Sequence, residues 1–245
     1  MEQIDILDVA VDQVNLDAAV AEIDRLIKNR TESHLVVTPN SEMLVMAQQD
    51  LELKKILNQA DLTVPDGIGV VWAARLLGAV MPERVAGIDL MKRLFSLAAQ
   101  KDYQIYLLGG RPGIPFQAKR RILSEYPELR VIGEHHGYLD NKSEAYVIKE
   151  INQLQPDLLF VGMGVPLQEK WLVRNLPSLQ ASVGMGVGGS FDVLAGQKKR
   201  APDWLQKLGL EWLYRLLQEP KRFRRILALP KFVYLVTKRK ILGLK

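Results

Sequence analysis

The sequence predicts an α/β fold with a mostly parallel sheet, on the basis of three observations. Short apolar segments alternate with longer helical patterns along most of the chain. This alternation is typical of parallel strands connected by helices that cover the sheet. The composition, 48% hydrophobic and 25% charged, is that of a globular protein rather than a disordered one. A length of 245 residues suits one large domain, or one domain with an appendage.

The predicted strands are short apolar runs rich in Val, Ile and Leu. In chain order they are Ile4–Val9, Leu35–Thr38, Leu62–Val64, Ile105–Leu108, Val131–Gly133, Leu158–Val161 and Val183–Val187. The predicted helices lie between them, at Leu16–Lys28, Ser41–Gln49, Leu51–Asn58, Gly69–Leu77, Gly87–Ala99, Pro115–Glu125, Ser143–Leu154 and Leu167–Asn175. Together these elements predict a Rossmann-like sheet flanked by helices.

The chain changes character after Gly196, where a helical, basic C-terminal appendage is predicted to begin. Residues 197–245 carry 14 Lys and Arg against 3 Asp and Glu, a net charge of +11, whereas residues 1–196 carry a net charge of −6. Trp204–Gln218 has the pattern of one helix, and Pro220 and Pro230 then delimit two shorter basic and apolar segments. We therefore predict an α/β core over residues 1–196 and an appendage over 197–245, with different roles.

Polar groups and glycines follow several predicted strands at their carboxyl ends, where ligands bind in parallel sheets. The Asp66 carboxylate is interpreted either as a general base in a pocket or as a turn or helix cap. Thr38 and Asn40, after another strand, either line the pocket or start the next helix. Gly109 and Gly110 form either a phosphate-binding turn or a plain strand-to-helix turn.

Two further glycine-rich segments, Phe160–Trp171 and Gly184–Phe191, each run from a strand to a predicted helix start. Gln168 in the first segment is a neutral donor and acceptor that could hold a sugar hydroxyl or a phosphate. Ser190 is a predicted N-cap, and Asp192 lies in the first turn that follows it. The alternative for both segments is close helix–strand packing with ordinary capping.

The amino-acid content argues against several kinds of site. The absence of cysteine excludes disulfides, Cys-based zinc sites, iron–sulfur clusters and thiol nucleophiles. No Asp-x-Asp pair is present to hold a metal-bound nucleotide diphosphate. His135-His136 is not expected to bind a metal, because neighbouring residues on a strand point to opposite faces. We therefore expect neither a metal nor a cofactor. Without a visible signal peptide or a long apolar run, the expected location is the cytoplasm.

The appendage combines basic residues with apolar and aromatic ones. Arg222 and Arg225 share a helix face, and they and Arg215 carry the forked guanidinium group that suits a diphosphate. This mixture is typical of a helix in the interface of an anionic membrane surface. The alternative is a solvated charged face over a packed helix. A dimer or a trimer would also cover the apolar residues.

Taken together, the motifs resemble the WecG/TagA/CpsF family of bacterial glycosyltransferases. The matching stretches are Thr38-Pro39-Asn40, Val64–Gly67, Pro82–Asp89, Tyr106–Gly110, His135–Tyr138, Gly162–Trp171, Gly184–Gly196, Lys199–Pro202 and Leu210–Arg225. The resemblance implies a metal-independent, inverting transfer of N-acetylmannosamine from UDP to undecaprenyl-diphosphate-linked N-acetylglucosamine, forming a β-1,4 linkage in wall teichoic acid synthesis. It leaves open a related transfer of N-acetylmannosaminuronic acid or of another hexose from UDP.

The resemblance also implies roles for individual residues. Asp66 matches the base that deprotonates the 4-hydroxyl of the acceptor, with Thr38 and Asn40 beside it. The residues expected to bind the sugar, the diphosphate or the uridine are Arg84, Gln168, Tyr138, Asp192, Arg215, Arg222 and Arg225. The implied location is the inner face of the cell membrane, to which the protein would be peripherally attached.

Two other classes of protein remain to be considered. An oxidoreductase that binds a nucleotide would carry GxGxxG with an acidic residue about 20 positions later, and the first predicted strand-to-helix turn does not. A nucleic-acid-binding module would use the basic appendage, but it would not need an acidic body with polar groups at successive strand ends. We therefore expect no nucleic-acid partner.

Overall fold

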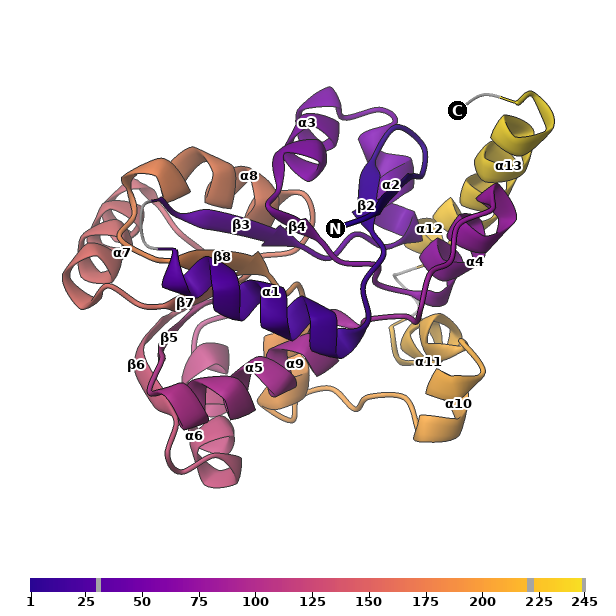
Figure 1. Ribbon diagram of the computed structural model, residues 1–245. Coiled ribbons are helices and arrows are strands. Elements are labelled where there is room, and N and C mark those ends of the chain that lie inside the picture. The colour runs from indigo at the N-terminus through magenta and orange to yellow at the C-terminus, as the bar shows by residue number, and fades with distance from the viewer. Residues whose placement is uncertain (30–31, 220–222, 244–245) are drawn as a thin grey trace.

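The computed structural model describes residues 1–29, 32–219 and 223–243. It confirms the predicted fold class, with a parallel six-stranded sheet in the order β4-β3-β8-β7-β5-β6 and helices on both faces (Figure 1). The strands are β3 (His34–Val37), β4 (Leu62–Thr63), β5 (Gln104–Gly109), β6 (Arg130–His135), β7 (Leu158–Gly162) and β8 (Val183–Gly186). β8 pairs with β3 on one side and with β7 on the other, so the last strand in the sequence lies near the middle of the sheet.

Two groups of helices cover the two faces of the sheet. One face packs against α2 (Ser41–Ala47), α3 (Leu51–Gln59), α4 (Ile68–Leu77), α7 (Asn141–Leu154) and α8 (Leu167–Asn175), which the short 3-10 helix Leu176–Ser178 extends. The other face packs against α1 (Leu16–Lys28), α5 (Gly87–Lys101), α6 (Ile114–Glu125) and α9 (Ser190–Leu194). The eight helices predicted between Leu16 and Asn175 therefore all exist, with ends that differ by a few residues at most.

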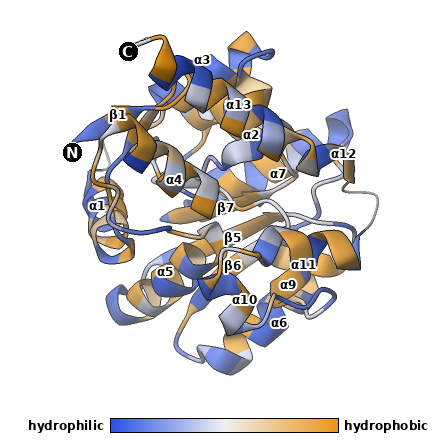
Figure 2. Cartoon of the chain, turned by 90° about the vertical axis from the view of Figure 1, so that its right-hand side faces the viewer, coloured by the Kyte–Doolittle hydropathy of each residue, from blue (hydrophilic) through white to orange (hydrophobic). Residues whose placement is uncertain are grey.

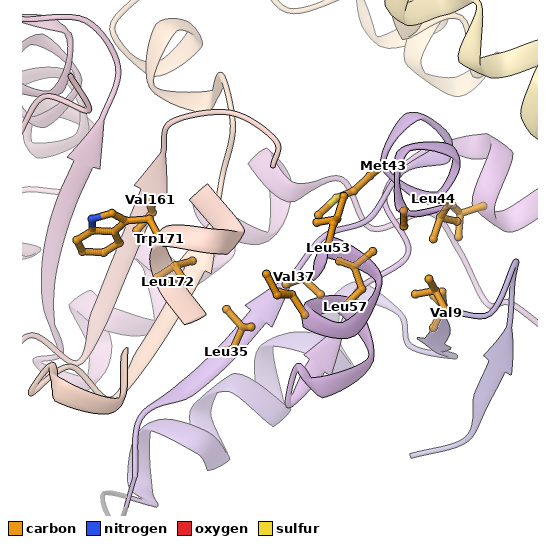
Figure 3. Close-up of a cluster of buried hydrophobic side chains, with 14 of the residues drawn as sticks. Val9, Leu35, Val37, Met43, Leu44, Leu53, Leu57, Val161, Trp171 and Leu172 are labelled. Carbon is orange, nitrogen blue, oxygen red and sulfur yellow. The ribbon is translucent and has the colours of Figure 1, made fainter. Parts of the chain in front are cut away.

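The strands are buried on both faces, which explains why they are continuous apolar runs in the sequence. Successive residues of β3 alternate between the two hydrophobic cores: Leu35 and Val37 join one core, and Val36 joins the other. Figure 3 shows Val37 beside Leu53 and Leu57 of α3, and Leu35 on the side of Leu172 of α8. Because the strands are parallel, the polar residues that follow them lie at the same edge of the sheet.

The predicted strand Ile4–Val9 is wrong in extent. The segment forms a small antiparallel hairpin of β1 (Gln3–Asp5) and β2 (Ala10–Asp12), with a turn between them. Leu7 and Asp8 have positive φ angles of 57° and 61°, and the backbone N–H of Asp8 donates to the Asp5 carboxylate at 2.9 Å. Ile6 and Leu7 are buried although they lie in the turn, and their apolar character made the turn resemble a strand.

The prediction of one helix over Trp204–Gln218 is also wrong. The structure contains α10 (Asp203–Lys207) and α11 (Glu211–Gln218), separated at Gly209, which has a φ of +72°. A Cβ atom added at Gly209 would lie 3.0 Å from the Ile68 side chain at the start of α4. The break therefore allows the appendage to approach the body closely, next to the segment that contains Asp66.

The end of the appendage packs into the body. It contains α12 (Phe223–Ile226) and α13 (Ala228–Ile241), and Pro230 lies in the first turn of α13, where its missing N–H costs no intrahelical hydrogen bond. Among the described helices, none combines the length and the apolar character needed to cross a bilayer. α13 packs against α2 and α4 and buries Phe232 and Val236 in the core on that face. The change of composition at residue 196 is therefore not a boundary between two separate cores.

Candidate active site

A polar cavity with a volume of about 280 Å³ lies at the carboxyl ends of β3 and β4, between the body and the appendage. Most of the residues predicted to carry the chemistry contribute to its lining. Its polar lining residues are Thr38, Asn40, Ser41, Glu42, Asp66, Arg84, Gln168, Glu169, Ser190, Glu211, Arg215 and Arg225. The topology therefore gathers side chains from seven separate parts of the sequence around one space.

Asp66 lies between β4 and α4, and it does not cap the helix that follows. The N-cap of α4 is Gly67, with a φ of +92°, and the Asp66 backbone N–H donates to the Pro39 carbonyl at 3.1 Å. The Asp66 carboxylate accepts a hydrogen bond from the backbone N–H of Gly87 at the start of α5. The structure thus disfavours the helix-cap interpretation and places this carboxylate on the cavity wall.

Burial raises the pKa of the Asp66 carboxyl from 3.8 to about 6. The positive charges of Arg215 and Arg84 act in the opposite direction and lower the pKa, and the negative charge of Glu211 raises it. A carboxylate with a pKa near 6 is largely ionised at neutral pH and is a stronger base than an ordinary aspartate.

Thr38 and Asn40 follow β3 and contribute to the same wall of the cavity. The Asn40 Oδ1 atom accepts from the Met43 backbone N–H at 3.0 Å, so Asn40 is the N-cap of α2 as well as a cavity residue. Thr38 lies against Gly87, where an added Cβ atom would be 3.4 Å from the Thr38 Oγ1 atom. Both of the interpretations considered for Asn40 therefore hold at once.

Three charged side chains connect the body to the appendage across the cavity. Arg84 reaches it from the loop between α4 and α5, and Arg215 reaches it from α11. Arg84 Nη2 lies 3.1 Å from Glu211 Oε2, and Arg215 Nη2 lies 2.7 Å from Glu211 Oε1. Each guanidinium group donates to a different oxygen of the same buried carboxylate.

Gln168 lies at the start of α8 and is almost fully buried, with 3% of its surface exposed. Its Oε1 atom accepts from the backbone N–H of Gly188 at 2.9 Å and from that of Gly164 at 3.1 Å, and its Nε2 atom donates to Glu169 Oε1 at 2.7 Å. The amide therefore joins the β7–α8 loop to the β8–α9 loop. Its predicted contact with a sugar or a diphosphate stays a prediction.

Glu169 is the second carboxylate of the cavity, and it is 1% exposed. Burial raises its pKa to about 7, against the effect of the hydrogen bond from Gln168. The Oε2 atom of Glu169 is buried, and the described residues offer it no hydrogen-bond partner. The low polarity of this corner therefore favours the neutral carboxylic acid near neutral pH.

A wider groove of about 1350 Å³ lies beside the cavity, and Gly110, Tyr138 and Asp192 line it. Met163 lines the groove and Gly164 lines the cavity, so the β7–α8 loop contributes to both. The other residues of the groove include Glu52, Arg111, Gly137, Leu139, Glu144, Leu167, Lys170, Trp171, Arg174, Lys198, Gln218 and Glu219. Tyr138 is 68% exposed, which leaves its ring free to stack on a planar ligand.

The glycines at the end of β5 are required by close packing. A Cβ atom at Gly109 would lie 2.5 Å from the carbonyl of Gly162, and the Gly110 N–H already donates to that carbonyl oxygen at 2.9 Å. This N–H is therefore engaged and not free for a phosphate. This geometry fits the interpretation as a plain strand-to-helix turn. Gly110 lines the groove, and its predicted contact with the substrate stays a prediction.

The structure describes two of the three predicted arginines of the appendage, Arg215 and Arg225. Arg225 lines the cavity, with its Nε atom 3.6 Å from Glu42 Oε1. Arg222 lies outside the described residues. Ser190 lines the cavity as the first residue of α9, and the N-cap is Gly189 instead, so that capping prediction is wrong by one position.

His135 and His136 lie next to each other at the end of β6. The expectation that His135 and His136 point to opposite faces is wrong, because His135 ends β6 and the alternation of a strand stops there. The centroids of their rings are 4.3 Å apart. Within the described ranges, no group of three or more His, Asp or Glu is arranged to hold a metal ion.

Three carboxylates of the cavity, Glu42, Glu169 and Glu211, were not among the predicted site residues. Glu169 directly follows Gln168, so the same strand-end argument would have reached it. Glu211 precedes Arg215 by four residues, a spacing that places both on one helix face. Its pairing with Arg84, however, joins residues 127 positions apart and has no signal in a single sequence.

Comparisons with known proteins agree with this geometry. The sequence profile described as "Glycosyl transferase WecG/TagA/CpsF family" matches residues 4–245. Two curated relatives come from Staphylococcus aureus, strains MW2 and NCTC 8325 / PS 47, and each is 36% identical over 239 residues. The matches cover 97% of this chain and 93% of each relative. Both relatives are named N-acetylglucosaminyldiphosphoundecaprenol N-acetyl-beta-D-mannosaminyltransferase.

Proposed function

The chain belongs to the WecG/TagA/CpsF family of glycosyl transferases, and we propose that it transfers N-acetylmannosamine from UDP to undecaprenyl-diphosphate-linked N-acetylglucosamine. The product would be a β-1,4-linked disaccharide on the lipid carrier, made in the synthesis of wall teichoic acid. The observation that carries the proposal is the Asp66 carboxylate, which has a pKa near 6 and shares its cavity with Arg84 and Arg215.

In this proposal Asp66 is the general base. Its carboxylate takes the proton of the acceptor 4-hydroxyl, and the oxygen attacks the anomeric carbon of the donor. The bond from this carbon to the β-phosphate oxygen breaks, and UDP leaves with the electron pair. A single displacement with one base inverts the anomeric configuration, and Asp66 afterwards gives its proton to water.

The arginines stabilise the departing diphosphate. Arg84 and Arg215 each use one terminal nitrogen on Glu211, and a guanidinium group has further N–H donors for two phosphate oxygens. Arg225 adds a third positive charge on the cavity wall. Charge held in place before the reaction neutralises the leaving group without a metal ion.

The wide groove is proposed to hold the nucleotide end of the donor. It adjoins the cavity through the β7–α8 loop, as a UDP-sugar needs if its uridine and its anomeric carbon are to occupy neighbouring spaces. Tyr138 would stack on the uracil ring, and Asp192 would face the ribose. The ion pair of Asp192 with Lys198, at 2.8 Å, holds its carboxylate in place.

The appendage is proposed to rest on the inner face of the cell membrane, where the lipid acceptor resides. Figure 2 shows that hydrophobic residues (orange) form much of α11. Large apolar side chains are exposed from α10 to the start of α13: Trp204, Leu208, Trp212, Leu217, Phe223 and Leu227. Apolar groups within a segment of net charge +11 suit an anionic lipid interface.

The test is an assay of the purified protein with UDP-N-acetylmannosamine and a short-chain lipid diphosphate that carries N-acetylglucosamine. The expected product is one disaccharide whose NMR couplings identify a β-1,4 linkage. UDP-N-acetylmannosaminuronic acid and UDP-N-acetylglucosamine serve as competing donors. Transfer from either of these, but not from UDP-N-acetylmannosamine, would assign the chain to a related activity of the family.

A further inference from the structure

Glu211 holds a position that its sequence context does not require. It is the first residue of α11, where an acidic side chain commonly faces the helix dipole and a cation four residues later. Such residues are normally exposed, whereas Glu211 is 8% exposed and lies on the cavity wall. Its burial and its pairing with Arg84 of the body need a separate explanation.

The carboxylate of Glu211 is surrounded by three guanidinium groups. Its two oxygens accept from Arg84 and Arg215, and Arg200 Nε lies 4.0 Å from Oε1. Arg200 is itself fixed by two hydrogen bonds of 2.5 and 2.6 Å to Asp89, in the first turn of α5. The backbone just before Glu211 is held as well, because Gly209 lies close to the Ile68 side chain. Glu211 therefore has a fixed place between the body and the appendage.

The positive charges of the cavity have two opposing effects on the proposed reaction. Positive charges that stabilise a leaving diphosphate also stabilise the ionised form of a nearby carboxylate and so weaken it as a base. Arg215 and Arg84 both act on Asp66 in this way, and Glu211 acts against them. The buried negative charge of Glu211 lies between the two arginines. It limits their effect on the basicity of Asp66 while both arginines stay in the cavity.

We propose that Glu211 is a positioning residue of the transfer reaction, which holds Arg84 and Arg215 at a fixed separation across the cavity and keeps Asp66 basic. The proposal rests on the proposed function for its kinetic consequences. Glu211 does not compete with the substrate for the two arginines, because each guanidinium group donates to Glu211 through only one nitrogen. Glu211 stays in place while the remaining N–H groups meet the diphosphate.

The groups that face Asp66 are known from every element around it. Arg84 comes from the loop before α5, Arg200 from the segment before α10, and Arg215 and Glu211 from α11. Glu42 of α2, Glu169 of α8 and Arg225 of α12 line the same cavity. In this set, Glu211 is the negative charge that acts on Asp66 most strongly.

The first experiment compares the wild type with Glu211→Gln and Glu211→Asp on soluble substrates across the pH range 5–9. Glu211→Gln removes the charge at nearly constant shape. We expect its turnover at pH 8 to fall roughly tenfold, the size expected for losing one charge-assisted hydrogen bond. The acidic limb of its kcat/KM profile should move to lower pH. Glu211→Asp keeps the charge but is too short to reach both arginines, so its turnover should fall while the acidic limb stays near that of the wild type.

The second experiment measures the pKa of Asp66 directly by carboxyl-carbon NMR, with Asp66→Asn used to assign the signal. Glu211→Gln should lower this pKa, and this readout does not depend on any transfer activity. An inactive wild type would therefore defeat the proposed function alone, whereas an unchanged Asp66 pKa in Glu211→Gln would defeat the role of Glu211.

Asp8→Asn is the matched control. Asp8 also pairs the body with the appendage, through Arg239 at 2.7 Å, but it lies outside the cavity lining. The acidic limb of the kcat/KM profile of Asp8→Asn should stay at the wild-type pH. A higher turnover in Glu211→Gln would show that Glu211 competes with the substrate and would overturn the proposal. If Glu211→Gln does not fold, wild-type turnover in Glu211→Asp would still overturn it.

Discussion

At the scale of single residues, Asp66 is held in an unusual electrostatic position. Its carboxylate accepts from the Gly87 backbone N–H, lies among arginines, and still has a pKa raised to about 6 because it is buried. This combination leaves it ionised near neutral pH and ready to accept a proton. It also means that the folded protein bears a cost for keeping this partly buried carboxylate ionised.

The first prediction concerns the Asp66→Asn variant. The change keeps the shape of the side chain and removes the base, so turnover should fall by about 10²–10⁴. UDP binding, measured by calorimetry, should change little, because the nucleotide is assigned to the neighbouring groove. Turnover close to that of the wild type would remove Asp66 from the mechanism.

The second prediction concerns the stability of the same variant as a function of pH. The pKa of Asp66 rises from 3.8 in the unfolded chain to about 6 in the fold. Relative to high pH, protonated Asp66 therefore raises the free energy of unfolding. This contribution is complete below pH 3.8 and is lost as the pH rises through 6. At pH 8 the ionised group destabilises the fold by up to about 3 kcal/mol. Asp66→Asn should increase the free energy of unfolding at pH 8, and the gain should shrink towards pH 4. A gain that is equal at both pH values in urea titrations would contradict the assigned pKa.

The sequence predicted the site at this scale where a residue follows a strand, as Asp66, Thr38 and Asn40 do. The parallel sheet brings such residues to one edge, so their meeting needs no knowledge of side-chain contacts. Glu211 could not be found in this way, because its partner Arg84 is distant in sequence and its burial depends on the packing of Gly209 on Ile68.

At the scale of elements, α13 is the least expected part of the fold. Its sequence is that of a basic, exposed tail, yet Phe232 and Val236 are 1% and 0% exposed against α2 and α4. Arg239, which adds to the positive charge of the tail, binds Asp5 at 3.1 Å and Asp8 at 2.7 Å. The sequence predicted a helical appendage but divided it at Pro230, which lies inside α13. It did not reveal the docking surface, since packing between distant helices leaves no local periodicity.

The third prediction tests this docking. Phe232→Ala removes a fully buried ring from the core that α13 shares with the body, so the free energy of unfolding should fall by about 3–5 kcal/mol. Tyr234→Ala is the matched control, because Tyr234 is 61% exposed on the same helix and should change it by less than about 1 kcal/mol. Equal effects in urea titrations would mean that α13 is not packed on the body in solution.

At the scale of the whole molecule, charge is divided between an acidic body and a basic appendage. The cavity that contains Asp66 lies where they meet. Arg215 and Arg225 line this cavity, whereas Lys238 and Lys240 lie exposed at the end of α13. The same positive segment thus presents some charges to the cavity and others to the solvent. The two sets should be separable by experiment.

The fourth prediction distinguishes the arginines of the cavity from the exposed lysines of α13. Arg215→Ala and Arg225→Ala should each lower turnover on a soluble, short-chain acceptor, because they remove charge from the leaving diphosphate. The double change of Lys238 and Lys240 to Ala should leave that turnover intact. It should weaken sedimentation with anionic liposomes, more so at low salt than at high salt. Loss of liposome binding in Arg215→Ala with normal turnover would make this arginine an anchor rather than a site residue.

The fifth prediction concerns metal removal. If the arginines neutralise the diphosphate, as proposed, turnover should be unchanged in excess EDTA. The control is a glycosyltransferase of known magnesium dependence, assayed in the same buffer. Loss of activity that magnesium or manganese restores would show that a metal ion supplies part of the charge.

The position of β8 has a consequence for how the protein is made. β3 and β4 form one half of the sheet, β5, β6 and β7 form the other, and β8 alone joins them by pairing with β3 and β7. On the ribosome, residues 183–186 emerge after all the other strands, so during most of synthesis the two halves have no strand in common. Asp66 belongs to the first half and Gln168 to the second, and Glu211 follows both. The cavity around Asp66 is therefore assembled last, and no nascent chain that stops before β8 can carry it.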